Sequence, residues 1–278
     1  MNKRIAIQGF AGSFHEMAAM HYLGKNIVII PCSSFSELVK TAENKKLSDG
    51  GFMAIENSIA GSILPNYALL EKSNLLIAGE IYLHISHNLM VNKGVKLEDI
   101  KEVHSHPMAL LQCMDFLDKF PHWKLVEKED TASSAKYIQQ HNNKHAAAIA
   151  GKPAAALYQL EMIKPNIQTH KNNYTRFLFL QKSDNKNAGH DANKASISFQ
   201  TDHSKGALAR VLTKIASYNI NLSKLQSIPV PAKEWQYIFH ADLEFDTVLD
   251  FEKAIEKIKP VIAQLKIFGI YKKGETIF

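Results

Sequence analysis

The sequence predicts an α/β fold in two parts, and three observations lead to this prediction. The chain has 278 residues, a length that suggests two domains. Up to residue 182, short apolar runs of strand length alternate with helical patterns, as in largely parallel sheets. A polar segment over 183–194 has almost no large apolar residues, and a half-buried strand pattern begins at 195. We therefore expect domains at 1–182 and 195–278, joined by a linker at 183–194.

Composition narrows the class of protein. The hydrophobic content of 46% is ample for a core, and no apolar run is long enough to cross a bilayer, so we expect no membrane association. Cys32 and Cys113 lie far apart without metal spacing, and the N-terminus lacks the apolar stretch of a signal peptide. These features favour free thiols and a cytoplasmic location. The net charge of +6 comes from scattered lysines, which favours a solvated surface over nucleic-acid binding.

The first strand leads into a loop that could bind an anion. Ile5–Ile7 is a short buried strand, and Ser13-Phe14-His15-Glu16 forms a capping box for the helix that follows. Backbone N–H groups at such a helix start can bind an anion, which makes Gly12 and Ser13 candidates. The loop matches neither the dinucleotide fingerprint nor the P-loop.

Strands are expected at 27–30 and 51–55, with a helix from 35 to about 45 between them. A second loop of this kind follows the strand at 51–55. Glu56, Asn57 and Ser58 stand directly after the strand at 51–55, before a helix that ends near 70. Ligands of open α/β sheets bind at the carboxyl ends of strands. These side chains are either ligand contacts or loop hydrogen bonders, and the pattern leaves both open.

The next region has the length of a second lobe. The passage 75–91 is strand-like, and His87 interrupts its apolar positions, either as a satisfied core residue or as a histidine that faces a cleft and titrates near neutral pH. Ser105 and Pro107 start a helix that contains Gln112. A strand at 124–126, a helix at 131–140 capped by Asp130, a strand at 146–150 and a helix at 153–160 complete the alternation.

The stretch 172–180 changes from polar to apolar and aromatic, and Thr175 and Arg176 stand at the change. The chain has only two other arginines, Arg4 and Arg210. A planar guanidinium beside a hydroxyl at the mouth of a strand suits a small carboxylate ligand. The alternative is a turn in which the arginine pairs with a surface acid.

The C-terminal part has a different order of elements. A strand at 195–201, a helix from Gly206 to about 218, strands at 220–228 and 235–245, a helix at 248–265 and a strand at 267–272 are expected. This β-α-β-β-α-β order is that of a ferredoxin-like unit. It contains no cluster of catalytic type, so we expect a role in binding or regulation.

Together these residues resemble the prephenate dehydratases that carry a C-terminal ACT domain. The resemblance covers nearly the whole chain, and the joint order and spacing of its motifs are specific. The motifs are Gly9-Phe10-Ala11-Gly12-Ser13-Phe14, Glu56-Asn57-Ser58-Ile59-Ala60-Gly61-Ser62, His87-Asn88, Ser105-His106-Pro107-Met108-Ala109, Gln112-Cys113, Asp130-Thr131-Ala132, 146–150 and Asn173-Tyr174-Thr175-Arg176-Phe177. The resemblance implies a two-lobed catalytic domain similar to periplasmic binding proteins, with lobes at roughly 1–78 plus 172–182 and at 79–171.

The implied reaction converts prephenate to phenylpyruvate, with loss of carbon dioxide and water, in phenylalanine biosynthesis. Aromatisation drives it, so no cofactor or metal is expected. We expect Thr175 to donate to the leaving hydroxyl, with Glu56 and His87 as ultimate acids. The expected substrate-binding residues are Gly12, Ser13, Asn57, Ser58, Gln112, Arg176 and Phe177.

The resemblance also implies regulation by L-phenylalanine and a homodimer or homotetramer. The expected effector-binding residues are Gly206, Ala207, Leu208, Leu225, Gln226 and Ser227. Gln226 and Ile228 stand in a segment where the family usually has Glu-Ser-Arg-Pro, so both charges are absent and we expect weak or altered inhibition. Two alternatives stay open: an arogenate dehydratase, and a two-lobed sensor of carboxylate ligands without catalysis.

Overall fold

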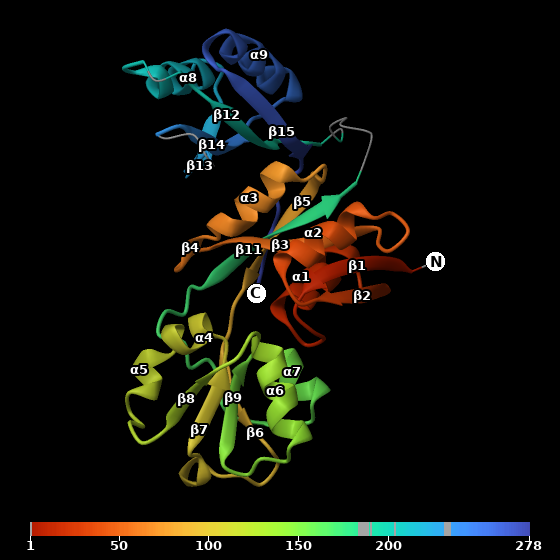
Figure 1. Ribbon diagram of the computed structural model, residues 1–278, viewed down its shortest axis with the longest axis vertical. Helices are drawn as coiled ribbons and strands as arrows, with labels where there is room; N and C mark the ends of the chain where they lie inside the picture. The colour runs from red at the N-terminus through yellow and green to blue at the C-terminus, as the bar shows by residue number, and fades with distance from the viewer. Residues whose placement is uncertain (1, 183–188, 190, 203, 231–234) are drawn as a thin grey trace.

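The computed structural model describes residues 2–182, 189, 191–202, 204–230 and 235–278. Three β-sheets follow one another along the long axis of the molecule (Figure 1). The sheet of the first lobe lies in the middle, between the sheet of the second lobe and the sheet of the C-terminal domain. This arrangement is the expected α/β fold, with two lobes and an added antiparallel domain. None of the helices in the described ranges has the length and apolar character that a membrane span requires.

The first lobe is a seven-stranded sheet whose strand order is β16-β5-β11-β3-β1-β2, with β4 paired to β3. Both faces are covered, α1 packing on one side and α2 and α3 on the other, so consecutive residues of β1, β3 and β11 enter two different cores. Its elements are β1 (Lys3–Gln8), α1 (Phe14–Leu23), β2 (Ile27–Cys32), α2 (Phe35–Glu43), β3 (Gly50–Asn57), β4 (Gly61–Ser62), α3 (Leu64–Lys72), β5 (Leu76–His84), β11 (Tyr174–Gln181) and β16 (Thr276–Ile277).

The second lobe is a five-stranded sheet whose strand order is β10-β6-β9-β7-β8. Its two faces are covered by α4 with α5 and by α6 with α7, respectively. Its elements are β6 (Asn88–Val91), η1 (Leu97–Asp99), β7 (Glu102–Ser105), α4 (Pro107–Gln112), α5 (Met114–Leu117), β8 (Lys124–Glu127), α6 (Thr131–Gln140), β9 (Ala146–Ala150), α7 (Lys152–Leu157) and β10 (Glu161–Lys164).

The chain passes between the lobes at a different point from the one expected. All of β5 belongs to the first lobe, because it pairs with β11 as far as His84 opposite Tyr174. The second lobe begins only with β6 at Asn88, so the expected boundary after residue 78 is wrong by several residues. The return to the first lobe precedes Tyr174, close to the expected position.

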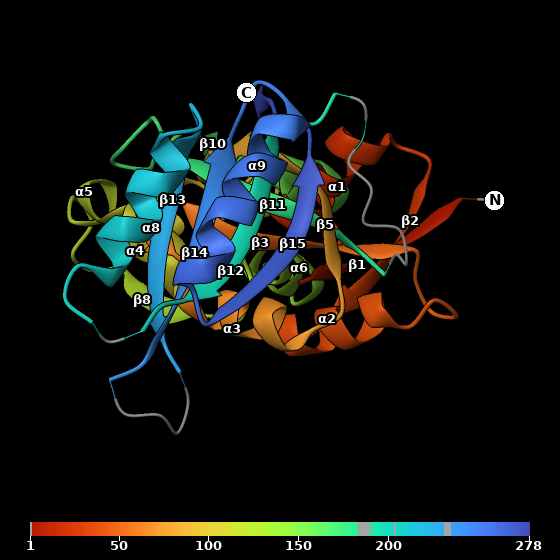
Figure 2. The same cartoon turned by 90° about the horizontal axis from the view of Figure 1, so that it is seen from above.

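The C-terminal domain is a four-stranded antiparallel sheet whose strand order is β13-β14-β12-β15. Viewed from above, α8 and α9 lie over the outer face of this sheet (Figure 2). Its elements are β12 (Lys194–Gln200), α8 (Ala207–Ala216), β13 (Asn221–Pro229), β14 (Tyr237–Glu244), α9 (Val248–Ile258), η2 (Lys259–Val261) and β15 (Gln264–Tyr271). The order is the predicted one, but α9 ends before Pro260, which cannot continue a helix, rather than near 265.

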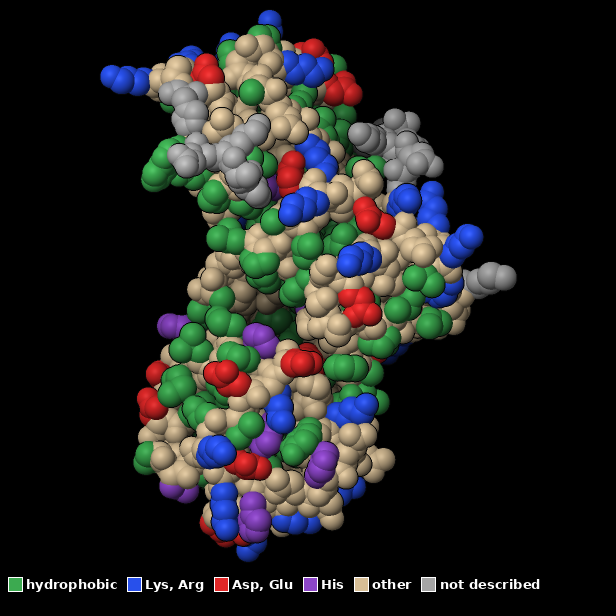
Figure 3. All heavy atoms as spheres, viewed as in Figure 1, with side chains coloured by type: hydrophobic (Ala, Val, Ile, Leu, Met, Phe, Trp, Pro, Cys, Tyr) green, Lys and Arg blue, Asp and Glu red, His purple; other side chains and the backbone are tan. Residues whose placement is uncertain are grey.

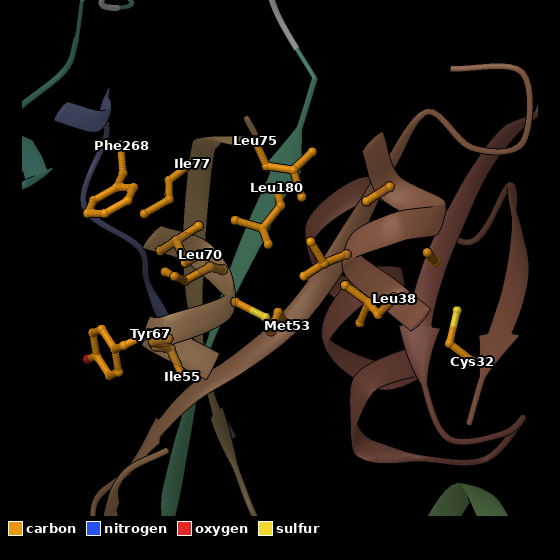
Figure 4. Packing of buried hydrophobic residues seen from close by; sticks show 14 of the residues in the cluster. Cys32, Leu38, Met53, Ile55, Tyr67, Leu70, Leu75, Ile77, Leu180 and Phe268 are labelled. Carbon is orange, nitrogen blue, oxygen red and sulfur yellow. The ribbon is translucent and has the colours of Figure 1, made fainter. Parts of the chain in front are cut away.

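The inner face of the C-terminal sheet packs on the first lobe. Phe268 of β15 lies beside Leu70 of α3 and Ile77 of β5 in one buried cluster (Figure 4). Lys266 donates to the carbonyls of Leu70 at 3.3 Å and Ser73 at 2.9 Å, at the C-terminal end of α3. The end of the chain extends this contact, because β16 forms a parallel pair with β5. The C-terminal domain is therefore docked on the sheet that carries the predicted site.

Candidate active site

Three amide side chains, two of them buried and that of Gln112 half-buried, form a ring where the two lobes meet. Asn57, at the end of β3, donates to Asn173 Oδ1 at 2.7 Å. Asn173 donates in turn to Gln112 Oε1 at 2.9 Å, and Gln112 Nε2 lies 3.4 Å from Asn57 Oδ1. Asn57 and Asn173 belong to the first lobe and Gln112 to α4 of the second. The ring therefore links the lobes, and the space-filling view shows that the surface is hollowed between them (Figure 3).

Thr175 is attached to this ring through its hydroxyl. Asn57 Nδ2 donates to Thr175 Oγ1 at 3.0 Å and to the carbonyl of Tyr174 at 3.1 Å. Thr175 and Asn57 stand opposite each other in the β3–β11 pair, which places both side chains on the same face of the sheet. The expected proximity of Asn57, Gln112 and Thr175 is thus present.

His87 joins the ring from the passage just before the second lobe. Its Nε2 lies 2.9 Å from Gln112 Oε1, and the ring of Phe14 meets it edge-on at 5.7 Å. Burial lowers the pKa of His87 to about 4, although the hydrogen bond to Gln112 acts in the opposite direction. The imidazole is therefore neutral at pH 7 and donates through Nε2, while Nδ1 has no partner among the described residues. The expected titration near neutral pH is not supported.

Arg176 lies on the opposite face of β11 from Thr175. Its guanidinium donates to Glu80 at 2.6 Å, to Asp242 and to the Tyr271 hydroxyl at 3.1 Å, and only 4% of the residue is exposed. The expectation that Arg176 binds a substrate carboxylate is corrected, because successive side chains of a strand point to opposite faces. The alternative prediction, in which Arg176 pairs with an acid, describes these contacts better, although Glu80 and Asp242 are buried and not at the surface.

Glu56 is separated from the ring for the same reason. It stands opposite Arg176 in the β3–β11 pair, and its carboxylate accepts from Lys224 of β13. The structure therefore does not bring it to Thr175 as an acid. Phe177 is 1% exposed and packs in the core of the first lobe, with the His15 ring at 4.9 Å.

The loop before α1 touches the second lobe. Ser13 caps α1 by accepting from the Glu16 N–H at 3.3 Å, as predicted, but the Glu16 carboxylate accepts from Gly12 rather than from Ser13. The Ser13 N–H donates to Phe10. Both backbone donors expected to bind an anion are thus engaged within the loop. Tyr158 of the second lobe donates to the carbonyl of Ala11 at 2.9 Å, so the lobes are in contact here.

Two residues beside the expected ones complete the site. Asn173 is a fully buried member of the ring, and Gln168 accepts from the backbone N–H of His87 at 3.0 Å. Asn173 belongs to one of the motifs that carry the family resemblance. Apart from that motif, the only sequence feature that marks it is the polar pair Asn172-Asn173 before β11. Ser58 holds the same segment, because its Oγ accepts from the Tyr174 N–H at 2.9 Å.

Comparison with known proteins decides the family. The family model for prephenate dehydratase matches residues 5–185. The chain belongs to the prephenate dehydratase family. It is a carbon–oxygen lyase that dehydrates prephenate, as the resemblance implied. It is 33% identical over 267 residues to the bifunctional chorismate mutase/prephenate dehydratase of Buchnera aphidicola, covering 95% of this chain and 69% of the relative.

The chain is also similar to other relatives and to solved structures. Arogenate dehydratase 2 of Petunia hybrida is 35% identical over 291 residues, covering 99% of this chain and 73% of the relative. The prephenate dehydratase of Staphylococcus aureus superposes with a TM-score of 0.81 at 27% identity, covering 97% of this chain and 100% of that structure. The dehydratase of Arthrobacter aurescens in complex with L-phenylalanine has the same fold, with a TM-score of 0.87 at 24% identity and coverage of 97% and 90%.

In this dehydratase, part of the expected effector site surrounds a pocket of about 280 Å³ in the C-terminal domain. Gly206 precedes α8 with φ +75°, a conformation that favours glycine. Residues of α8 and of β14 face the same space. The lining is Thr201, Asp202, Ser204, Gly206, Ala207, Leu208, Ala209, Tyr237 and Phe239. Leu225, Gln226 and Ser227 lie on β13, the edge strand of this sheet, and are not among these lining residues.

Proposed function

We propose that Thr175 is the hydrogen-bond donor to the leaving hydroxyl of prephenate, and that the amide ring holds it in place. One observation carries this proposal. Asn57 donates to Thr175 Oγ1, so the threonine oxygen is the acceptor in that contact and its own O–H remains able to donate elsewhere. The contact also orients the hydroxyl at the junction of the lobes.

The reaction then proceeds without a strong protein acid. His87 is neutral at pH 7, and Glu56 is paired with Lys224 on the other face of the sheet. Aromatisation of the ring supplies the driving force, so oriented hydrogen bonds to the departing hydroxyl are the contribution asked of the enzyme. The phenyl ring of Phe14 beside His87 keeps water from the departing carboxylate. The neutral His87 donates through Nε2 to the side-chain carbonyl of Gln112, and this hydrogen bond fixes Gln112 within the ring of amides.

The experiment is the turnover of a Thr175→Val variant, which keeps the shape and removes the hydroxyl. Phenylpyruvate formed from prephenate is followed by ultraviolet absorbance. We expect kcat to fall about a hundredfold or more, while the matched Thr175→Ser variant keeps most of it. A valine variant with most of the wild-type turnover would remove Thr175 from the role of donor.

Prephenate is the preferred substrate over arogenate in our proposal. Relatives named for either activity have similar identity, 33% and 35% in the cases above. Arogenate has an ammonium group where prephenate has a keto group, and a site for it needs an acid. Among the described residues, no carboxylate takes part in the ring formed by Asn57, Gln112 and Asn173 with Thr175 and His87. Turnover of both substrates in parallel tests this, and faster turnover of arogenate would reverse the preference.

We further propose amino-acid regulation through the pocket at Gly206, Ala207 and Leu208, in a cytoplasmic homodimer or homotetramer. The relative from Arthrobacter aurescens was solved with L-phenylalanine, which supports this effector class. Leu225, Gln226 and Ser227 complete the site from an edge strand that a second copy can approach. Because Gln226 brings no charge, inhibition by L-phenylalanine is weak. Turnover and sedimentation measured with and without L-phenylalanine test both statements, and full inhibition at low micromolar concentration would refute the weak response.

A further inference from the structure

The two strands that carry Asn57 and Thr175 also reach the C-terminal domain. Thr175 stands opposite Asn57 in the β3–β11 pair, and Arg176 stands opposite Glu56. Because the side chains of a strand alternate, the first pair faces the active site and the second faces the C-terminal sheet. Asn57 is therefore the sequence neighbour of Glu56, and Thr175 is the sequence neighbour of Arg176. Both charged residues lie on the face of the sheet that is turned to the C-terminal domain.

The C-terminal domain presents two charges in the same way. Lys224 of β13 and Asp242 of β14 are partners across their own strand pair. Lys224 donates to Glu56, and Arg176 donates to Asp242, so each strand pair supplies one cation and one anion. We call these four residues, Glu56, Arg176, Lys224 and Asp242, the charge quartet. All four line one pocket of about 240 Å³ between the two domains.

The ion pair between Arg176 and Asp242 is the more deeply buried half of the quartet. Arg176 and Asp242 are 4% and 5% exposed, and Asp242 also accepts from Ser196. Burial raises the pKa of Asp242, but the charge and hydrogen bond of Arg176 outweigh it and the pKa lies below its usual range. Asp242 is thus a carboxylate at neutral pH. Removing one partner of such a pair leaves a buried charge uncompensated, so the pair resists separation.

We propose that the charge quartet positions Asn57 and Thr175 for the dehydration, so that the docked C-terminal domain sets the geometry of the active site. A shift of β13 or β14 moves the side chains of Glu56 and Arg176, and their backbones move the adjacent residues of the site. Misplacement of a catalytic group by about 1 Å can lower a rate about a hundredfold. The expected effector residues 225–227 directly follow Lys224, so an effector there acts on the same link.

The test compares Lys224→Met and Asp242→Asn with a matched control in the full-length chain. Lys266→Met is the control, because Lys266 also crosses the interface but donates to carbonyls at the end of α3. For the two quartet variants we expect kcat to fall about tenfold or more with little change in KM, since only the positioning is altered. The Lys266→Met variant loses stability but keeps its kcat within about twofold. An unchanged kcat in Lys224→Met, or an equal loss in Lys266→Met, overturns the proposal.

A double-mutant cycle tests whether the quartet acts through Thr175. On a Thr175→Val background, Lys224→Met should lower kcat by less than about twofold, because the hydroxyl it positions is gone. A full additional loss would show that Lys224 does not act through Thr175 and overturns that part of the proposal. The inference rests on the proposed role of Thr175, and the two can fail separately. If Thr175→Val alone retains wild-type turnover, the donor assignment fails, while the comparison with Lys266→Met still decides the quartet.

Discussion

The contact between the lobes at Gly12 can be tested with two alanine substitutions at the ends of the same helix. Gly12 precedes α1 and Gly24 follows it, and both have φ +85°. An alanine at either position is strained by the positive φ, at a cost of about 1–2 kcal/mol. A Cβ at Gly24 would meet no described residue within 4 Å, so Gly24→Ala measures that strain alone.

At Gly12 the added Cβ would also press on the second lobe. It would lie 3.1 Å from Ala154 Cα and 3.4 Å from Ala154 Cβ, in α7. These atoms belong to a helix and cannot rotate away, so the loop and α7 must move apart by a few tenths of an ångström. Overpacking of this kind adds about 1–3 kcal/mol to the strain. We expect Gly12→Ala to lose about 2–5 kcal/mol of unfolding free energy in all.

Urea unfolding of both variants, together with kcat/KM for prephenate, is the assay. We expect Gly24→Ala to keep its kcat/KM, and Gly12→Ala to lose about tenfold because Gln112 moves with its lobe relative to Asn57. Equal stability and equal activity in the two variants would refute the reasoning. It would mean that the second lobe yields to the added methyl group at no cost.

Two other predictions concern stability. Burial lowers the pKa values of His87 and His240 to about 4, so between pH 6.5 and pH 4 the unfolded chain binds more protons than the folded one. The free energy of unfolding should therefore fall by about 2 kcal/mol for each histidine between pH 7 and pH 5, measured by urea unfolding at both pH values. A His240→Gln variant whose pH dependence equals that of the wild type would contradict this. Asn173→Leu removes one hydrogen bond from Asn57 and one from Gln112, although both keep other partners, and should cost about 1–3 kcal/mol of unfolding free energy. No measurable loss would mean that water replaces the amide.

Local patterns predicted much of the fold. The alternation of strands and helices, the caps at Ser13 and Asp130 and the β-α-β-β-α-β order were all readable because they depend on residues close in sequence. The passage from β5 to β6 was missed because residues 85–87 contain neither glycine nor proline, and the apolar pattern continues through them. Of the predicted site residues, Asn57, Gln112 and Thr175 lie together in the structure.

Arg176 shows why the rest could not be predicted. Its neighbour Thr175 was assigned to the same ligand, although adjacent residues of a strand face opposite ways. The acids that bind Arg176 are 96 and 66 residues away in the chain, so no local pattern identifies them. Their burial also depends on the docking of a domain whose placement the sequence does not indicate.

The pairing of β16 with β5 affects how this protein folds during synthesis. The sheet of the first lobe takes its strands from residues 3–62, 76–84, 174–181 and 276–277. On the ribosome, a nascent chain can pair β1, β2 and β3 early, but β11 must wait for the second lobe and β16 for the C-terminal domain. We therefore expect the second lobe, whose strands lie within 88–164, to be the first unit to complete its sheet. The sheet whose strands begin earliest in this sequence is therefore the last of the three to be finished.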